Sequence, residues 1–150
     1  MISYKDDKTG SEITLIPSNE YQVTTMVDFG TKVLGTQNAS LEKLANFKNE
    51  ISSARTFSFL HELEGLLDHG LIKGGDLNNA IVIVDKVISE NKLNKLSKLL
   101  GKKKVKVEKE GILNNVKLRY HNEPARHKLL DVLGDITLLG RPIKGHIIAA

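Results

Sequence analysis

Apolar and polar positions alternate along the chain with two periods, which predict strands and helices. In residues 21–29 the odd positions are Tyr, Val, Thr, Val and Phe, and most even positions are polar, as in a half-buried strand. An earlier strand is predicted at Glu12–Ile16, joined to this one at Pro17-Ser18-Asn19. The unbroken apolar run Ala80–Val84 is typical of a buried strand.

Apolar side chains three and four residues apart predict helices. The first begins at Ser40, which can cap it, and its apolar stripe continues to Ile51. In the last helix Pro124 falls in the first turn, where proline is tolerated. A second helix is predicted after a strand-like segment at 56–59 and ends at Gly70. A third, lysine-rich helix runs from Ser89 to Gly101. The last helix runs from Asn122 or Glu123 to about residue 139.

Short alternating strands are also predicted at 105–107 and 116–120. Strands and helices therefore follow one another without the regular alternation of a parallel α/β fold. The expected fold class is α+β.

Composition narrows the classes of protein to consider. The 150 residues are 40% hydrophobic and 27% charged, which suits one packed domain. The absence of cysteine excludes a disulfide scaffold, thiolate zinc ligands and a cysteine nucleophile. No apolar run reaches the roughly 18 residues that cross a bilayer, and the first residues lack the pattern of a secretion signal. We therefore expect no transmembrane segment and a cytoplasmic location.

Positive charge is concentrated in one segment. Between Lys86 and Lys106 there are eight lysines and one acidic residue, whereas the whole chain has a net charge of only +4. The segment is either a binding face for nucleic acid, a membrane surface or an anionic ligand, or the solvent face of a lysine-rich helix. No arginine or aromatic residue accompanies the lysines, so no nucleic-acid partner is expected.

The last predicted helix carries the most informative residues. His127 and Asp131 are four apart and share one helix face, and Asp135 extends the row by one turn. A neutral imidazole and a carboxylate so placed form half of a zinc site, and a further carboxylate can orient a ligand or catalytic histidine. An exposed ion pair worth a few tenths of a kcal/mol has the same spacing, so the spacing alone leaves both interpretations open.

Two other clusters could carry chemistry. Thr56 stands beside Arg55 and near the aromatic Phe57 and Phe59, so its hydroxyl could line a pocket, although an ordinary strand that buries one aromatic ring has the same pattern. Gly74-Gly75 permits a close backbone approach or a left-handed turn. The chain contains neither a phosphate-binding loop motif nor a Gly-x-Ser-x-Gly elbow.

Several motifs follow one another along the chain: Ala-Arg-Thr-Phe at 54–57, Gly70-Leu71, Gly74-Gly75, Asn79-Ala80-Ile81-Val82, and Arg126-His127-Lys128-x-x-Asp131-x-x-Gly134-Asp135. In this order they resemble the second domain of the bacterial UDP-3-O-acyl-N-acetylglucosamine deacetylases. Residues 84–120 look most like the branch of that family fused to a 3-hydroxyacyl-carrier-protein dehydratase.

The resemblance implies roles for individual residues. The family removes acetate from UDP-3-O-acyl-N-acetylglucosamine with zinc, the committed step of lipid A synthesis. His127 and Asp131 match its two zinc ligands from this domain, and Asp135 matches a carboxylate that orients a catalytic histidine. Thr56 matches the threonine that stabilises the developing oxyanion. Lys128 matches a lysine near the substrate.

The resemblance also implies a fold. It is a two-layer sandwich of a mixed sheet packed on helices, with a βαβ insert at 57–84 that forms the passage for the 3-hydroxyacyl chain of the nucleotide-sugar lipid. Residues 85–121 would be a lineage-specific extension. The substrate-contacting residues expected in the insert are Phe57, Phe59, Leu63, Leu67, Gly75 and Leu77.

Part of the family's active site is not found in these residues. The general-base glutamate and the third zinc ligand, an adjacent histidine, come from the first domain of the family, and this sequence has no Glu-His pair. The catalytic histidine of the family falls after residue 150, so His146 is expected to be a surface or strand-edge residue. We expect residues 1–150 to be the second domain, truncated before its end, to bind zinc weakly and to have no activity alone.

Two other functions stay open on the residues themselves. A binding module would dock an acidic partner or nucleic acid on the lysine-rich segment, with steep salt dependence and no effect of His127→Ala. A scaffold domain would support another enzyme, and its His127–Asp131 pair would never meet a metal.

Overall fold

The computed structural model describes residues 1–63, 79–86, 89–99, 111–113 and 116–150. The chain divides into two compact units. The first unit consists of Met1–Gly30, Gly35–Ala54 and Arg119–Ala150, and the second of Thr31–Leu34 and Arg55–Leu118.

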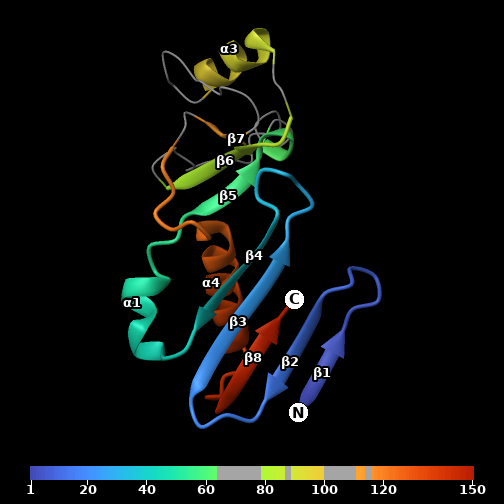
Figure 1. The fold of residues 1–150 in the computed structure, drawn as a ribbon, viewed down its shortest axis with the longest axis vertical. Helices are drawn as coiled ribbons and strands as arrows, with labels where there is room; N and C mark the ends of the chain where they lie inside the picture. The colour runs from blue at the N-terminus through green and yellow to red at the C-terminus, as the bar shows by residue number, and fades with distance from the viewer. Residues whose placement is uncertain (64–78, 87–88, 100–110, 114–115) are drawn as a thin grey trace. The chain divides into compact units, whose positions relative to one another are not determined.

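The first unit is built on a five-stranded mixed sheet in the order β1-β2-β8-β3-β4 (Figure 1). Neighbouring strands are antiparallel except β3 and β8, which run parallel. The last strand of the chain, β8, therefore lies in the middle of the sheet. The strands are β1 (Ile2–Lys5), β2 (Glu12–Ile16), β3 (Tyr21–Asp28), β4 (Thr36–Leu41) and β8 (Gly145–Ala149).

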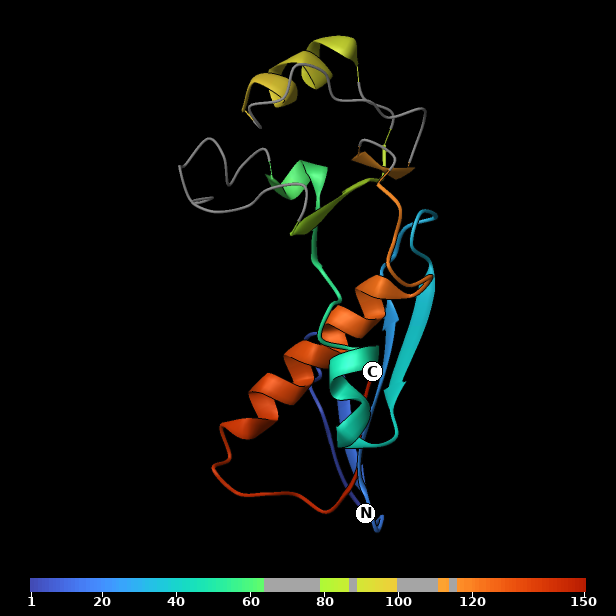
Figure 2. The same cartoon turned by 90° about the vertical axis from the view of Figure 1, so that its left-hand side faces the viewer.

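Helix α4 (Glu123–Thr137) crosses one face of this sheet (Figure 2). The 3-10 turn η1 (Leu44–Asn46) and the short helix α1 (Phe47–Glu50) lie next to each other in the chain, and Phe47 packs on the same core. The buried core consists of Val23, Ala39, Leu41, Ile51, Ala125, Leu129, Leu133 and Ile147. A mixed sheet with helices on one face confirms the predicted α+β class and two-layer arrangement.

The second unit contains a three-stranded sheet in the order β5-β6-β7. Strands β5 (Thr56–Phe59) and β6 (Ala80–Val84) are parallel, and β7 (Gly111–Ile112) is antiparallel to β6. Residues 60–63 are helical, residues 64–78 lie outside the described part, and helix α3 spans Glu90–Leu99. The assignment of 57–84 as an insert and 85–121 as an extension stays a prediction. The core of this unit consists of Leu60, Val82, Val84 and Leu113, with Leu63 and Leu93 packed against it.

The helix predicted from Ser40 is wrong in its first part, because Ser40 lies within β4. Ala39 and Leu41 are buried in the core, whereas the Ser40 hydroxyl lies 2.9 Å from the Thr24 hydroxyl on the neighbouring strand. Strand pairing with β3 thus outweighs the helical spacing of Leu41 and Leu44. Helical backbone in this region is confined to residues 44–50.

The strand predicted at 116–120 is also wrong, since the structure assigns no strand to these residues. Their polar groups bond elsewhere: the Tyr120 hydroxyl donates to the Asn49 carbonyl, and the Arg119 guanidinium donates to the Ser53 carbonyl. The strands predicted at Glu12–Ile16, Thr56–Phe59 and Ala80–Val84 and the last helix are confirmed. The strand predicted at 105–107 lies outside the described residues.

Candidate metal site

Helix α4 separates a core-facing row from a polar row. Ala125, Leu129 and Leu133 follow one another at four-residue spacing and are buried, which fixes the rotation of the helix on the sheet. His127 and Asp131 lie on a second row with the same spacing, and Asp135 follows one turn later. Anchoring of the apolar row therefore determines where the polar row points.

The imidazole of His127 is held in one tautomer. Its Nδ1 lies 3.2 Å from the carbonyl oxygen of Ala54. A carbonyl only accepts hydrogen bonds, so in the neutral ring Nδ1 carries the proton and Nε2 presents a lone pair. That Nε2 lies 3.6 Å from Oδ1 of Asp131. The two atoms that could bind a metal, His127 Nε2 and Asp131 Oδ1, therefore face each other.

Asp131 is held by a neighbouring ammonium group. The Nζ of Lys128 donates to Asp131 Oδ2 at 3.0 Å, which leaves Oδ1 directed at His127. Both Lys128 and Asp131 are partly exposed, with 45% and 40% of their side chains accessible, so the pair itself adds little stability. Its effect is to orient the carboxylate.

These two donors fit a zinc ion. Ligand atoms at about 2.0–2.2 Å from a tetrahedral zinc lie about 3.3–3.6 Å apart, and His127 Nε2 and Asp131 Oδ1 are 3.6 Å apart. A hydrogen bond from the second ring nitrogen to a backbone carbonyl is also usual for zinc-bound histidine. Within the part of the chain that the structure describes, no three His, Cys, Asp or Glu side chains come together to hold a metal.

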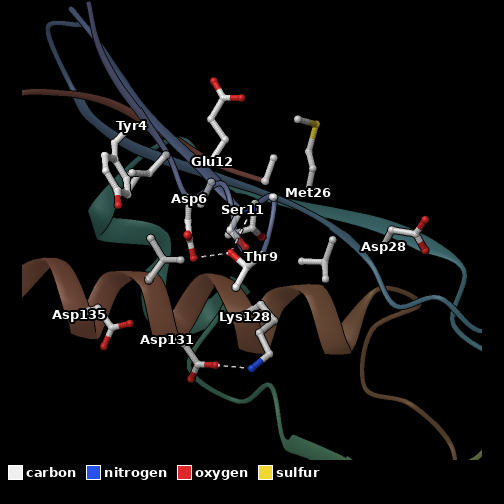
Figure 3. A pocket seen from close by; sticks show the side chains of 17 residues that line it. Tyr4, Asp6, Thr9, Ser11, Glu12, Met26, Asp28, Lys128, Asp131 and Asp135 are labelled. Atoms are coloured by element: carbon white, nitrogen blue, oxygen red, sulfur yellow. Dashed lines mark hydrogen bonds and ion pairs between the residues drawn. The ribbon is translucent and has the colours of Figure 1, made fainter.

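An open pocket of about 750 Å³ lies beside Asp131 and Lys128 (Figure 3). Lys128, Asp131 and Asp135 line it from α4, and Thr25 and Val27 line it from β3. Asp135 is exposed, one turn beyond Asp131, where its carboxylate can accept a hydrogen bond from a group that enters the pocket. The structure thus brings Asp131 into contact with both His127 and Lys128, and it places Asp135 on the pocket that Asp131 and Lys128 line.

The other wall of the pocket was not predicted from the sequence. It is formed by the β1–β2 hairpin, including Asp6, Thr9 and Glu12. Hydrogen bonds from the Thr9 hydroxyl and the Lys8 backbone N–H lower the pKa of the Asp6 carboxyl. The alternation of Ile2 and Tyr4 and the turn at Gly10 were the available signals.

The remaining predicted site residues belong to the second unit. Thr56 is exposed on β5, and the rings of Phe57 and Phe59 meet edge to face with centroids 6.3 Å apart. Leu63 packs against the core of this unit. Leu67, Gly75 and Leu77 lie outside the described residues.

His146 lies in β8, in the centre of the sheet rather than at its edge. Its Nε2 is 2.9 Å from the Thr24 hydroxyl on β3. Its neighbour Ile147 is in the core, so His146 points to the opposite face, away from His127. It takes no part in the candidate site.

The lysine-rich segment is only partly described. Lys86 and Lys98 are exposed, and Leu93 of α3 packs against the core of the second unit, as a helix with one solvent face requires. Among the described residues, no helix has both the length and the apolar character needed to span a bilayer.

Comparison with known proteins identifies relatives along nearly the whole chain. The bifunctional enzyme LpxC/FabZ of Porphyromonas gingivalis is 48% identical over 144 residues, 96% of this chain and 31% of the relative. The protein of the same name from Bacteroides thetaiotaomicron is 44% identical over 99% of this chain and 32% of its own length. A UDP-3-O-acyl-N-acetylglucosamine deacetylase from Syntrophotalea carbinolica is 35% identical over 90% of this chain.

The chain spans about a third of the length of these curated relatives. A sequence model of the LpxC family, UDP-3-O-acyl N-acetylglycosamine deacetylase, matches residues 2–98 and 98–150. On the strength of this match and of the identities above, the chain belongs to the LpxC family of UDP-3-O-acyl N-acetylglycosamine deacetylases.

Proposed function

We propose that this chain is part of a zinc-dependent amide hydrolase that deacetylates UDP-3-O-(3-hydroxyacyl)-N-acetylglucosamine in lipid A biosynthesis. The observation that carries the proposal is the state of His127: its Nδ1 is engaged by Ala54, and its Nε2 faces Asp131 at 3.6 Å. An ordinary exposed ion pair has no need of a fixed tautomer. Membership of the family supplies the substrate class.

In this proposal His127 Nε2 and Asp131 Oδ1 hold the zinc ion, and the first domain of the same polypeptide provides a third ligand. Bound zinc supplies Lewis-acid chemistry, which polarises an amide carbonyl and activates water. Lys128 holds Asp131 in position and adds positive charge where the substrate binds. A general base from the first domain takes a proton from water as the water oxygen adds to the acetyl carbon. The C–N bond then breaks while the nitrogen takes up a proton, which gives acetate and a free amine.

Thr56 is proposed to stabilise the negative charge that develops in this reaction, and Asp135 is proposed to orient a catalytic histidine. Negative charge develops on the acetyl oxygen as water adds, and a hydroxyl donor stabilises it. The exposed Thr56 side chain at the start of β5 is the proposed donor. Asp135 orients a catalytic histidine that enters the pocket, because an exposed carboxylate there can accept its N–H.

The second unit is proposed to bind the acyl chain. Phe57 and Phe59 are half-buried and offer partly exposed aromatic surface, and Leu63 lies beside them in sequence at the edge of an apolar core. Leu67, Gly75 and Leu77 complete the proposed passage. Apolar side chains suit an acyl chain because each methylene group that is buried contributes about 0.8 kcal/mol to the free energy of binding.

The first domain is proposed to dock on an apolar groove of the first unit. The groove has a volume of about 650 Å³ and lies beside α4 and η1, and the relatives have ample additional chain to cover it. Leu44, which lines it, is 58% exposed. Other lining residues are Tyr21, Phe47, Leu130, Leu133, Ile136 and Ile143.

Leu44→Asp tests this docking. Because Leu44 is exposed, we expect the substitution to change the stability of residues 1–150 by less than about 0.5 kcal/mol. A separately produced first domain should bind the variant at least about 10-fold more weakly by calorimetry, since a charge would be buried at the contact. Lys43→Asp, which places the same carboxylate at an exposed neighbour that does not line the groove, is the control. Equal affinity of Leu44→Asp and the native chain would exclude this groove as the docking site.

Residues 1–150 alone are expected to be inactive. They supply two zinc ligands and neither the general base nor the third ligand that the proposal draws from the first domain. We expect no detectable release of acetate from UDP-3-O-acyl-N-acetylglucosamine by the purified chain, whereas the complete polypeptide should turn over. Turnover of the complete polypeptide should disappear with a zinc chelator and return with added zinc. Deacetylation by residues 1–150 alone, or chelator-resistant turnover, would contradict the assignment.

We place this reaction in the cytoplasm and propose that a 3-hydroxyacyl-carrier-protein dehydratase is part of the same polypeptide. The support for the second point is the name LpxC/FabZ, bifunctional enzyme, of the relatives from Porphyromonas gingivalis and Bacteroides thetaiotaomicron.

A further inference from the structure

The carbonyl that orients His127 belongs to an irregular segment. Helix α1 ends at Glu50, and residues 51–53 form a turn that leads to Ala54. The buried Ile51 anchors this turn in the core, and the Ala54 N–H donates to the Ile51 carbonyl at 2.9 Å. A carbonyl at the end of a turn has no regular helix or strand to hold it, so its direction depends on other contacts.

Residues just before and inside the start of α4 supply those contacts. The Arg126 guanidinium donates to the Glu50 carbonyl at 2.6 Å. The Tyr120 hydroxyl donates to the Asn49 carbonyl at 3.0 Å and lies 2.9 Å from the Ser53 hydroxyl. Two backbone carbonyls and one hydroxyl within five residues of Ala54 are thus bonded to Arg126 and Tyr120, and the Ser53 carbonyl accepts from Arg119.

Arg126 and Tyr120, which together hold this turn, are also linked to the sheet and to each other. Arg126 Nε donates to Asn122 Oδ1 at 2.8 Å, and Asn122 Nδ2 donates to the Asn38 carbonyl of β4 at 2.7 Å. The guanidinium carbon of Arg126 lies 4.3 Å from the centre of the Tyr120 ring, a cation–π contact that joins the two clamping side chains. Arginine suits this position because its planar group donates in two fixed directions at once.

We propose that Arg126 and Tyr120 are positioning residues for His127. They hold the turn at 49–54 so that the Ala54 carbonyl keeps the proton on His127 Nδ1 and leaves Nε2 free to bind metal. The inference rests on the proposed role of His127 as a zinc ligand. It adds that the ligand is prepared before metal arrives, by side chains at the start of its own helix.

The tautomer of His127 tests this inference without any metal. Two-bond proton–nitrogen NMR correlations of metal-free residues 1–150 distinguish a protonated Nδ1 from a protonated Nε2. We expect the neutral ring of the native chain to be protonated on Nδ1. In Arg126→Gln and Tyr120→Phe we expect a measurable shift toward the Nε2-protonated form. Arg141→Gln, a change at an exposed arginine in the loop after α4, should leave the native tautomer unchanged.

Tyr120→Phe keeps the aromatic ring and loses only the hydroxyl, so it provides an answer if Arg126→Gln fails to fold. In the complete polypeptide both variants should bind zinc about 10-fold more weakly by chelator competition, the usual cost of losing an outer-shell partner. A native tautomer in folded Tyr120→Phe and in folded Arg126→Gln would overturn the inference. If zinc fails to perturb His127 in the native complete polypeptide, the proposed function fails instead, while the tautomer result stands by itself.

Discussion

His127→Ala in the complete polypeptide is expected to lower kcat/KM for deacetylation by at least about 10³-fold. Metal catalysis contributes several kcal/mol of transition-state stabilisation, and each 1.36 kcal/mol is tenfold in rate. The substitution removes Nε2, which lies 3.6 Å from the Asp131 carboxylate, and it leaves Asp131 as the one remaining proposed zinc ligand on this helix. Bound zinc, measured by elemental analysis, should fall together with the rate.

His121→Ala is the matched control, since His121 is exposed and precedes α4. It should retain native zinc content and native kcat/KM within about twofold. Neutralising the lysines at 102–104 should likewise change little, whereas a protein that acts through its basic segment would respond to those changes and ignore His127→Ala. Native zinc content and activity in His127→Ala would contradict the metal assignment.

Leu129→Ala is expected to lower the free energy of unfolding of the first unit by about 2–5 kcal/mol. Leu129 is fully buried in the contact between α4 and the sheet, so truncation removes apolar burial and leaves a cavity. Urea unfolding of residues 1–150, followed by circular dichroism, measures the change. Because the same row sets the rotation of α4, the variant should also weaken zinc binding by the complete polypeptide.

Leu138→Ala makes the same change of side chain just after the helix, where Leu138 is 86% exposed. We expect it to alter stability by less than about 0.5 kcal/mol. An equal loss in the two variants would mean that α4 does not pack on the sheet through the row of Leu129.

Local patterns were sufficient for elements that bury one face or both. The alternation in β3, the apolar run of β6 and the spacing along α4 each follow from burial, and the structure confirms them. Local patterns were insufficient where pairing with a distant strand determines the position of an element in the sheet. β8 inserts between β2 and β3, more than 100 residues away in sequence, and its Gly145-His146-Ile147-Ile148 stretch carries no short-range signal of that position.

The α4 part of the candidate site could be predicted from spacing, because a helix converts an interval of four residues into contact. The orientation of His127 could not. It depends on the carbonyl of Ala54, 73 residues earlier, and on side-chain bonds from Tyr120 in a segment that alternation had assigned to a strand. The hairpin wall at Asp6 was missed for the same reason: β1 gains its structure from β2 rather than from its own short sequence.

The most direct test of the account is a crystal structure of the complete polypeptide with diffraction recorded at the zinc absorption edge. We predict one anomalous peak at about 2.0–2.2 Å from both His127 Nε2 and Asp131 Oδ1, with His127 Nδ1 still bonded to the Ala54 carbonyl. A peak bound elsewhere, or zinc-supported deacetylation with no metal on these two atoms, would contradict the central claim.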